Sequence, residues 1–285
     1  MWLLLKGIDV VHEPPVTLSV AHSSSVAFTA LCAVGFLIAA GFAVHRAARR
    51  DMLLACATLA GVAACLLEPL LDFLGLCWYA RDNFAVVFIA FGVSIPLAAL
   101  VGYGFLFGAE AYIGAVMMRR GVKASKLWAL YAFAWTLDFV LEVLGIHVRF
   151  YTYYGPQPFS VFSVPLWFMF VNAAFPIVAG AVFYLYWNRL RGAGVLLAIP
   201  LLPCIFGALY LGTAWPIFVA LHTEVPGIVI WAAATATIAM SLALVRAIIR
   251  AIATANEGRQ AGEVMAADIT STPAASEAKL KPAST

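Results

Sequence analysis

The sequence predicts an all-α membrane protein, a bundle of seven transmembrane helices. Of its 285 residues, 64% are hydrophobic and 11% are charged, whereas soluble domains have about 45–50% apolar and about 25% charged residues. A membrane-spanning helix needs about 20 mainly apolar residues, and seven windows of the chain meet that requirement. Transmembrane barrels need alternating apolar and polar residues. The windows are apolar all round, so the barrel alternative is excluded.

The seven predicted spans follow one another up to residue 249. They cover residues 24–44, 52–76, 96–118, 125–146, 164–188, 193–212 and 226–249. The segment Met1–Leu5 is too short for the apolar region of a signal peptide, and we expect it to be retained at the interface. After residue 253 the chain is rich in Ala, Ser, Thr, Glu and Pro and has no aromatic residue, which is typical of disorder. The predicted organisation is a membrane domain, residues 1–253, and a disordered cytoplasmic tail, residues 254–285.

The positions of Lys and Arg predict the orientation, because cytoplasmic loops carry an excess of these residues. Of the 17 Lys and Arg residues, 14 follow the first, third, fifth or seventh span, and Lys6, Arg81 and Arg149 lie on the other side. This distribution predicts a multi-pass protein of the cell membrane with its N-terminus outside and its C-terminus in the cytoplasm. The net charge of +3 then reflects topology, and we predict no nucleic-acid partner.

No metal site is predicted. The five cysteines lie in or beside the spans without CxxC spacing, and we interpret them as small apolar packing residues. His147 and His222 lie on the predicted outer side with several acids, but no HExxH or other ligand spacing accompanies them.

A pattern of two acids and a glycine occurs twice, 70 residues apart. The residues are Glu68, Asp72 and Gly75 in the second span and Asp138, Glu142 and Gly145 in the fourth. In both copies a proline, Pro96 or Pro165, opens the next span, which is followed by arginine and then glycine. Because each copy contains two helices, both would point the same way, and the pattern predicts an internal parallel two-helix repeat. Chance recurrence in apolar sequence is the alternative.

Acidic residues occur in or at the ends of the predicted spans, whereas no span interior carries Lys or Arg. They are Glu68, Asp72, Glu110, Asp138 and Glu142. A charge at the centre of the membrane costs about 2.5–3.5 kcal/mol on insertion scales, and intramembrane acids usually face a cavity or a partner. Since no internal base is available, we expect some of these acids to be protonated.

The spacing of the acids predicts a shared pocket. Residues four apart lie on one helix face, so Glu68 with Asp72 and Asp138 with Glu142 would turn four carboxyl groups toward one place. A neutral carboxylic acid in a dry pocket can protonate a poor base, which makes these four residues candidate catalytic groups. The alternatives are that Asp72 and Glu142 are solvated helix ends, and that Glu110 makes a structural hydrogen bond to another helix.

The loops predicted outside are dense in aromatic residues. These loops are residues 77–95, 147–163 and 213–225, and the last includes Trp215 and Phe218. An interfacial aromatic belt would explain many of these rings. Aromatic faces also stabilise cations, so rings above an acid pocket would suit carbocation chemistry. Arg149 is the expected ion partner of Glu142.

At these motifs the sequence resembles two groups of membrane enzymes of isoprenoid metabolism, the membrane-bound terpene cyclases and the carotenoid hydratase-like proteins. The similar segments are Glu142-Val-Leu-Gly145, Tyr151-Thr-Tyr153 and Val164-Pro165-Leu166-Trp167. His147-Val-Arg149-Phe150 replaces the Gly-rich turn of the hydratase-like group. The resemblance implies that Glu142 and Asp138 donate a proton or activate water, with Glu68 and Asp72 as partners. The residues expected to contact the substrate are Trp78, Tyr79, Tyr151, Tyr153, Trp167 and Arg149.

The sequence therefore predicts an enzyme in the bilayer that starts cyclisation or hydration of a lipid-soluble isoprenoid by protonating it, without a cofactor. A proton-coupled transporter or channel is an alternative, because acids on paired helices also form proton relays. A metal-dependent prenyltransferase is another alternative, because two acids with the spacing of Asp138 and Glu142 could bind magnesium diphosphate.

Overall fold

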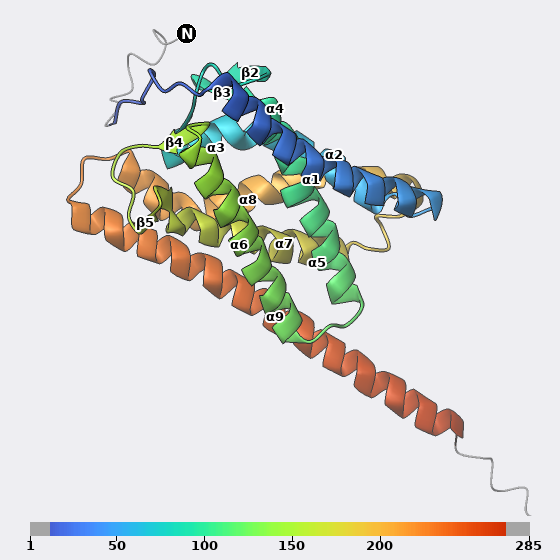
Figure 1. The fold of residues 1–285 in the computed structure, drawn as a ribbon. Coiled ribbons are helices and arrows are strands. Elements are labelled where there is room, and N and C mark those ends of the chain that lie inside the picture. Colours follow the sequence, from blue (N-terminus) through green and yellow to red (C-terminus); the bar gives the residue numbers. More distant parts are fainter. Residues whose placement is uncertain (1–11, 272–285) are drawn as a thin grey trace, which may run out of the picture.

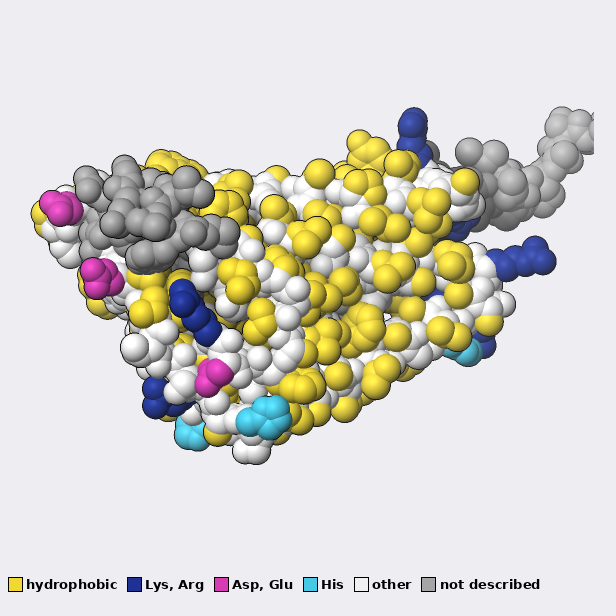
Figure 2. Space-filling model, turned by 90° about the horizontal axis from the view of Figure 1, so that it is seen from above, with side chains coloured by type: hydrophobic (Ala, Val, Ile, Leu, Met, Phe, Trp, Pro, Cys, Tyr) yellow, Lys and Arg dark blue, Asp and Glu magenta, His cyan; other side chains and the backbone are white. Residues whose placement is uncertain are grey.

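The computed structural model describes residues 12–271 and is mostly helical. Seven of its helical stretches are long and apolar enough to cross a membrane, which confirms the predicted number. Figure 1 shows them as one bundle from which the last helix projects. On the face seen in Figure 2, hydrophobic side chains cover the middle, and charged and histidine side chains gather at the two ends. The protein is a multi-pass membrane protein. Met1–Leu5 lies outside the described residues.

Two of the first three spans contain a change of helical geometry. The first span is α1 (His22–Ala48), the second is formed by α2 (Leu53–Ala64), η2 (Cys65–Leu67) and α3 (Glu68–Gly75), and the third by α4 (Leu97–Tyr103), η3 (Gly104–Ala109) and α5 (Glu110–Arg119). The η2 turn has 3₁₀ geometry and leads directly into Glu68 and Pro69. The η3 segment is π-helical, a geometry that is frequent at functional sites.

The last four spans differ from the predicted ranges mainly at their C-terminal ends. They are α6 (Ala124–His147), α7 (Leu166–Leu185), η4 (Gly192–Leu197) with α8 (Ala198–Leu221), and α9 (Gly227–Ser271). The prediction that Trp215 and Phe218 lie in an outer loop is wrong, because α8 continues through Pro216. Proline is tolerated in transmembrane helices where neighbouring groups satisfy the freed backbone.

The C-terminal boundary at residue 253 also needs correction. Helix α9 runs on to Ser271, through a stretch rich in alanine, the strongest helix former, and the next proline is Pro273. Residues 254–271 are therefore helical and not part of an irregular tail. Residues 272–285 lie outside the described part of the chain.

Three small antiparallel sheets connect the spans on the side of the bundle where α3 and α6 end. Strand β1 (Cys77–Tyr79) pairs with β4 (Tyr151–Tyr153), so that Tyr79 lies opposite Tyr151. The other two sheets are hairpins, β2 (Val86–Ala90) with β3 (Val93–Pro96) and β5 (Ser160–Val161) with β6 (Val164–Pro165). The β1–β4 pair ties the segment after α3 to the segment after α6.

The second and third spans pack backbone against backbone. A Cβ atom on Gly61 would lie 2.4 Å from the carbonyl oxygen of Tyr103, and one on Gly108 would lie 2.4 Å from that of Ala57. Small residues let transmembrane helices approach closely in this way. The contact holds α2 against η3 and thereby places Tyr103 beside the end of the second span.

Candidate functional site

Three carboxyl groups from two spans line one cavity inside the bundle. Glu68 is the first residue of α3, and Asp138 and Glu142 lie one turn apart on α6. The cavity has a volume of about 80 Å³. Its other polar lining residues are Cys32, Tyr79, Tyr103, Tyr151, Asn172 and Tyr210, and its apolar walls include Phe28, Phe107, Phe150 and Phe168. No Lys or Arg lines it.

Glu68 accepts hydrogen bonds from two phenols. The hydroxyl of Tyr79 donates to Oε1 over 2.9 Å, and the hydroxyl of Tyr103 donates to Oε2. Tyr79 comes from β1 and Tyr103 from the end of α4, just before the π-helical segment. Both oxygens of Glu68 are therefore fixed by donors from different elements, as a carboxylate in a cavity without a cation requires.

Asp138 is held by a hydrogen-bond chain that crosses three helices. The amide of Asn172 on α7 donates to Oδ2 of Asp138 over 2.6 Å, and the hydroxyl of Tyr210 on α8 donates to Oδ1 of Asn172 over 2.5 Å. All three side chains are buried. These hydrogen bonds fix the orientation of the Asn172 amide, because its oxygen accepts from the Tyr210 phenol and only its nitrogen can face Asp138.

Glu142 has one oxygen without a partner. Its Oε2 is buried and accepts no hydrogen bond within the described residues, while the side chains of Tyr153 and Tyr151 interact with the carboxyl group. Burial, followed by the charge of Glu142, raises the pKa of the Tyr153 phenol well above its ordinary value. The phenol keeps its proton and can act only as a donor or a neutral acceptor.

The structure places Asp72 outside this cavity. Its side chain is 5% exposed, and its Oδ2 has no hydrogen-bond partner in the part of the chain that is described. It interacts instead with the thiol of Cys77, at the start of β1. Asp72 is thus buried but does not line the cavity. Three of the four carboxyl groups predicted to share one pocket do line it.

The predicted substrate contacts divide into two groups. Tyr79 and Tyr151 line the cavity, and their rings pack edge to face with centroids 5.1 Å apart. Trp78 and Trp167 are buried, but neither lines the cavity; the Trp167 indole donates to Gln157 over 3.2 Å.

The predicted ion pair between Arg149 and Glu142 is wrong. Arg149 is exposed, and the ion pair found among the described side chains is a different one. The backbone of Arg149 is left-handed, with φ of 62°, just after the last turn of α6. At that turn the chain leaves the helix, and the guanidinium remains at the surface while Glu142 faces inward.

Sequence reasoning missed the residues that hold the carboxyl groups. These residues lie inside spans. Tyr103 donates a hydrogen bond to Glu68, and Asn172, oriented by Tyr210, donates one to Asp138. The lone asparagine in the middle of the fifth span was a usable signal, because a polar side chain within the membrane needs a partner on another helix.

The arrangement combines buried carboxyl groups, phenol donors and aromatic walls in a small space. No group of three His, Cys, Asp or Glu side chains suited to hold a metal ion occurs in residues 12–258. Comparisons of the chain with protein-family models, with curated proteins and with solved structures found no match.

Proposed function

We propose that the protein is a membrane enzyme that protonates a carbon–carbon double bond or an epoxide of a lipid-soluble isoprenoid and so starts its cyclisation or hydration. The observation that carries the proposal is the meeting of Glu68, Asp138 and Glu142 in one cavity without a cation. A cavity of about 80 Å³ is smaller than the roughly 300–1,000 Å³ of ligand pockets. It suits the reactive end of a chain whose remainder lies elsewhere.

The three acids have different surroundings, which suggests different roles. Glu142, with an unpartnered oxygen, is the proposed proton donor, and Glu68, with two phenol donors, is the proposed proton acceptor. Asp138 is held beside Glu142 as a carboxyl of fixed orientation. Pairs of carboxyls in unlike environments commonly divide acid and base roles in this way.

The proposed reaction balances without an oxidant or reductant. The carboxylic acid gives its proton to one carbon of the double bond, and a carbocation forms on the other carbon. With an epoxide the proton goes to the oxygen, one C–O bond breaks, the oxygen stays as a hydroxyl group, and the cation forms on the released carbon. Either a second double bond of the same chain attacks this carbon and closes a ring, or a water molecule adds to it. A proton then leaves to a carboxylate of the site. The rings of Phe107, Phe150 and Phe168 would stabilise the cation.

We also propose the finer features of the topology. A parallel repeat is supported by the pairing of β1 with β4, directly after the two acid motifs, and by hairpins that precede Leu97 and Leu166. An outside N-terminus and a cytoplasmic C-terminus in the cell membrane are supported by the position of five arginines, from three places in the sequence, at one end of the bundle, because cytoplasmic loops carry an excess of positive residues.

The proposed function is tested with cells that make isoprenoids and express the chain or its variants. We expect the wild type to change the lipid extract, and Glu142→Gln, Asp138→Asn and Glu68→Gln to lower the yield of the new product at least about 100-fold, as removal of a general acid does. Glu224→Gln, an exposed residue outside the cavity, is the matched control. Size-exclusion chromatography and helical content check that the variants fold.

Two results would contradict the proposal. One is an unchanged product yield in Glu142→Gln and Glu68→Gln. The other is proton flux through vesicles containing the wild type with no change in any lipid, which would identify a transporter.

A further inference from the structure

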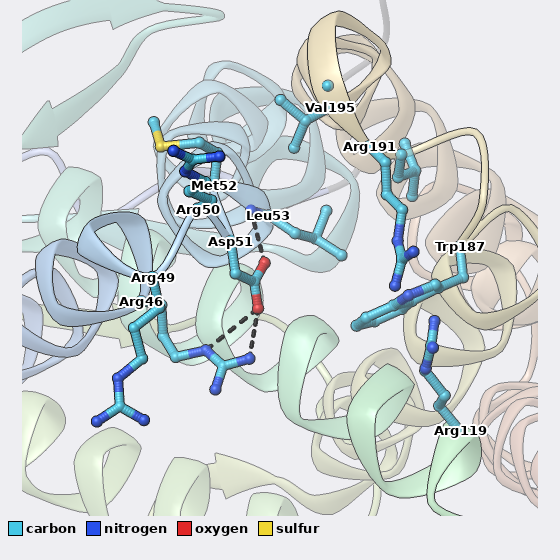
Figure 3. A pocket seen from close by; sticks show the side chains of 12 residues that line it. Arg46, Arg49, Arg50, Asp51, Met52, Leu53, Arg119, Trp187, Arg191 and Val195 are labelled. Carbon is cyan, nitrogen blue, oxygen red and sulfur yellow. Dashed lines mark hydrogen bonds and ion pairs between the residues drawn. The ribbon is translucent and has the colours of Figure 1, made fainter.

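A second, larger cavity lies where the first span turns into the second. It has a volume of about 540 Å³, within the range of ligand pockets. Arginines line it from three places: Arg46 from the last turn of α1 with Arg49 and Arg50 directly after that helix, Arg119 from the end of α5, and Arg191 from the segment before η4. Figure 3 shows Arg46 with Asp51 on one side of the cavity and Arg191 with Arg119 on the other, where the Trp187 ring lies between these two arginines.

The charge inside this cavity is not balanced by protein groups. Asp51 is the one acid in its lining, and it pairs with Arg46: Nε donates to Oδ2 over 3.1 Å, and Nη2 to the same oxygen over 2.5 Å. Across the described residues this is the one ion pair. A cytoplasmic excess of arginine requires only that the residues lie near one membrane surface, and it does not require them to line a common cavity.

Trp187 positions one of the arginines in the wall. The guanidinium carbon of Arg119 lies 4.6 Å from the centroid of its ring, which fixes both side chains. The indole Nε1 is buried and has no acceptor among the residues that the structure describes. The cavity therefore has a wall of arginines held partly by Trp187, and it fits a ligand that supplies acceptors and negative charge.

An apolar groove begins at the same arginine. The groove lies between α1, α5 and α6 and has a volume of about 660 Å³. Its polar lining residues are Arg46, Glu110, Tyr112 and Arg120, and the rest of the lining is apolar, with side chains such as Ile38, Phe42, Ile113 and Phe133. Ile38 and Phe42 are 57% and 64% exposed, so the groove opens to the side of the bundle. Arg46 thus joins a cationic cavity at the end of the bundle to an apolar groove along it.

We infer that the cavity and the groove together bind an amphiphile whose phosphate headgroup lies among Arg46, Arg119 and Arg191 and whose hydrocarbon chain lies in the groove. Guanidinium groups match phosphate oxygens with paired hydrogen bonds. This binding site is separate from the acid cavity and does not depend on the chemistry proposed there.

The ligand could be a phosphate-bearing phospholipid or an isoprenoid phosphate, because both share this head and chain. Binding of dioleoyl phosphatidic acid and of farnesyl phosphate to the purified full-length protein, measured by native mass spectrometry, separates the two sources. Dioleoylglycerol lacks the phosphate, and inorganic pyrophosphate lacks the chain. We expect at least one phosphorylated lipid to bind about tenfold or more tightly than both of these controls.

Matched substitutions locate the site. Arg191→Gln should weaken binding of the phosphorylated lipid about tenfold, the loss expected for one charge-assisted hydrogen bond, whereas Arg250→Gln, an exposed arginine of α9 outside the cavity, should not. Ile38→Trp should weaken binding by filling the groove. Leu37→Trp, at a neighbouring lipid-facing position that does not line it, should leave binding unchanged.

Three results would overturn the inference. Equal losses in Arg191→Gln and Arg250→Gln would mean that binding follows surface charge alone. Equal losses in Ile38→Trp and Leu37→Trp would mean that the hydrocarbon chain does not bind in the groove. Pyrophosphate binding as tightly as the phosphorylated lipids would show that the cavity takes a soluble anion.

Discussion

Asn172 on α7 donates a 2.6 Å hydrogen bond to Asp138 on α6, and its own oxygen is occupied by Tyr210 of α8. One amide thus links an acid of the candidate site to two further helices. Tyr210, which orients this amide, also lines the cavity. The position of Asp138 therefore depends on the packing of three spans.

Replacing Asn172 with Leu should destabilise the protein by about 1–3 kcal/mol, because Asp138 would lose its donor while remaining buried. Tyr210→Phe removes only the outer bond and should cost less, about 0.6 kcal/mol, the average for hydrogen bonds between transmembrane helices. Unfolding in mixed micelles with increasing denaturing detergent measures both changes. Equal stability of the Leu variant and the wild type would contradict the role of this chain.

The paired glycines of the two acid motifs should respond differently to substitution. A Cβ atom on Gly145 would lie 2.7 Å from ring atoms of Tyr151, whereas one on Gly75 would meet nothing closer than 3.7 Å. Gly145→Ala should therefore destabilise by about 1–3 kcal/mol through overpacking, and Gly75→Ala should be nearly neutral. Thermal unfolding of the two variants compares them directly, and a larger loss in Gly75→Ala would contradict the packing described for Tyr151.

Asp51 should make stability depend on pH. Partial burial opposes its ionisation, but hydrogen bonds from Arg46, Tyr112 and the Leu53 amide outweigh this effect and hold the pKa of the carboxyl below its ordinary value of 3.8. Because the pKa is lower in the folded state, the stabilisation is present above the unfolded-state pKa and is lost as pH falls through the folded-state pKa.

The measurement for Asp51 is the difference in melting temperature between the wild type and Asp51→Asn. We expect a clear difference at about pH 6 that shrinks as the pH is lowered below about 4. Tyr112→Phe, which removes one of the donors, should show a smaller difference of the same sign. A difference that stays constant across this range would mean that the carboxylate charge contributes nothing.

The spans could be predicted from the sequence because each is an apolar run of membrane length, a local property of the chain. The presence of both Asp138 and Glu142 in the cavity follows from their spacing on an uninterrupted helix, α6. The same spacing on α3 did not predict the position of Asp72, because its surroundings depend on β1, whose Cys77 interacts with its carboxyl group. Helix periodicity carries no information about such a neighbour.

The rest of the site could not be predicted because it depends on contacts between distant segments. The β1–β4 sheet joins Cys77–Tyr79 to Tyr151–Tyr153 in strands of three residues, too short to produce an alternating pattern. The arginines of the second cavity were correctly placed near one end of the spans. Their convergence with Trp187 depends on how α5, α7 and the turn after α1 pack.

The π-helical segment η3 allows one span to serve two sites. Each hydrogen bond in a π-helix encloses one more residue than in an α-helix, so the turn between Tyr103 and Glu110 advances the following helix by the equivalent of one residue, about 100° of rotation. Tyr103 faces the acid cavity, while Tyr112 and Arg119, beyond the wide turn, face the groove and the arginine cavity. With a regular α-helix here, Tyr112 and Arg119 would be turned by about 100° relative to Tyr103 and away from the positions that they now occupy.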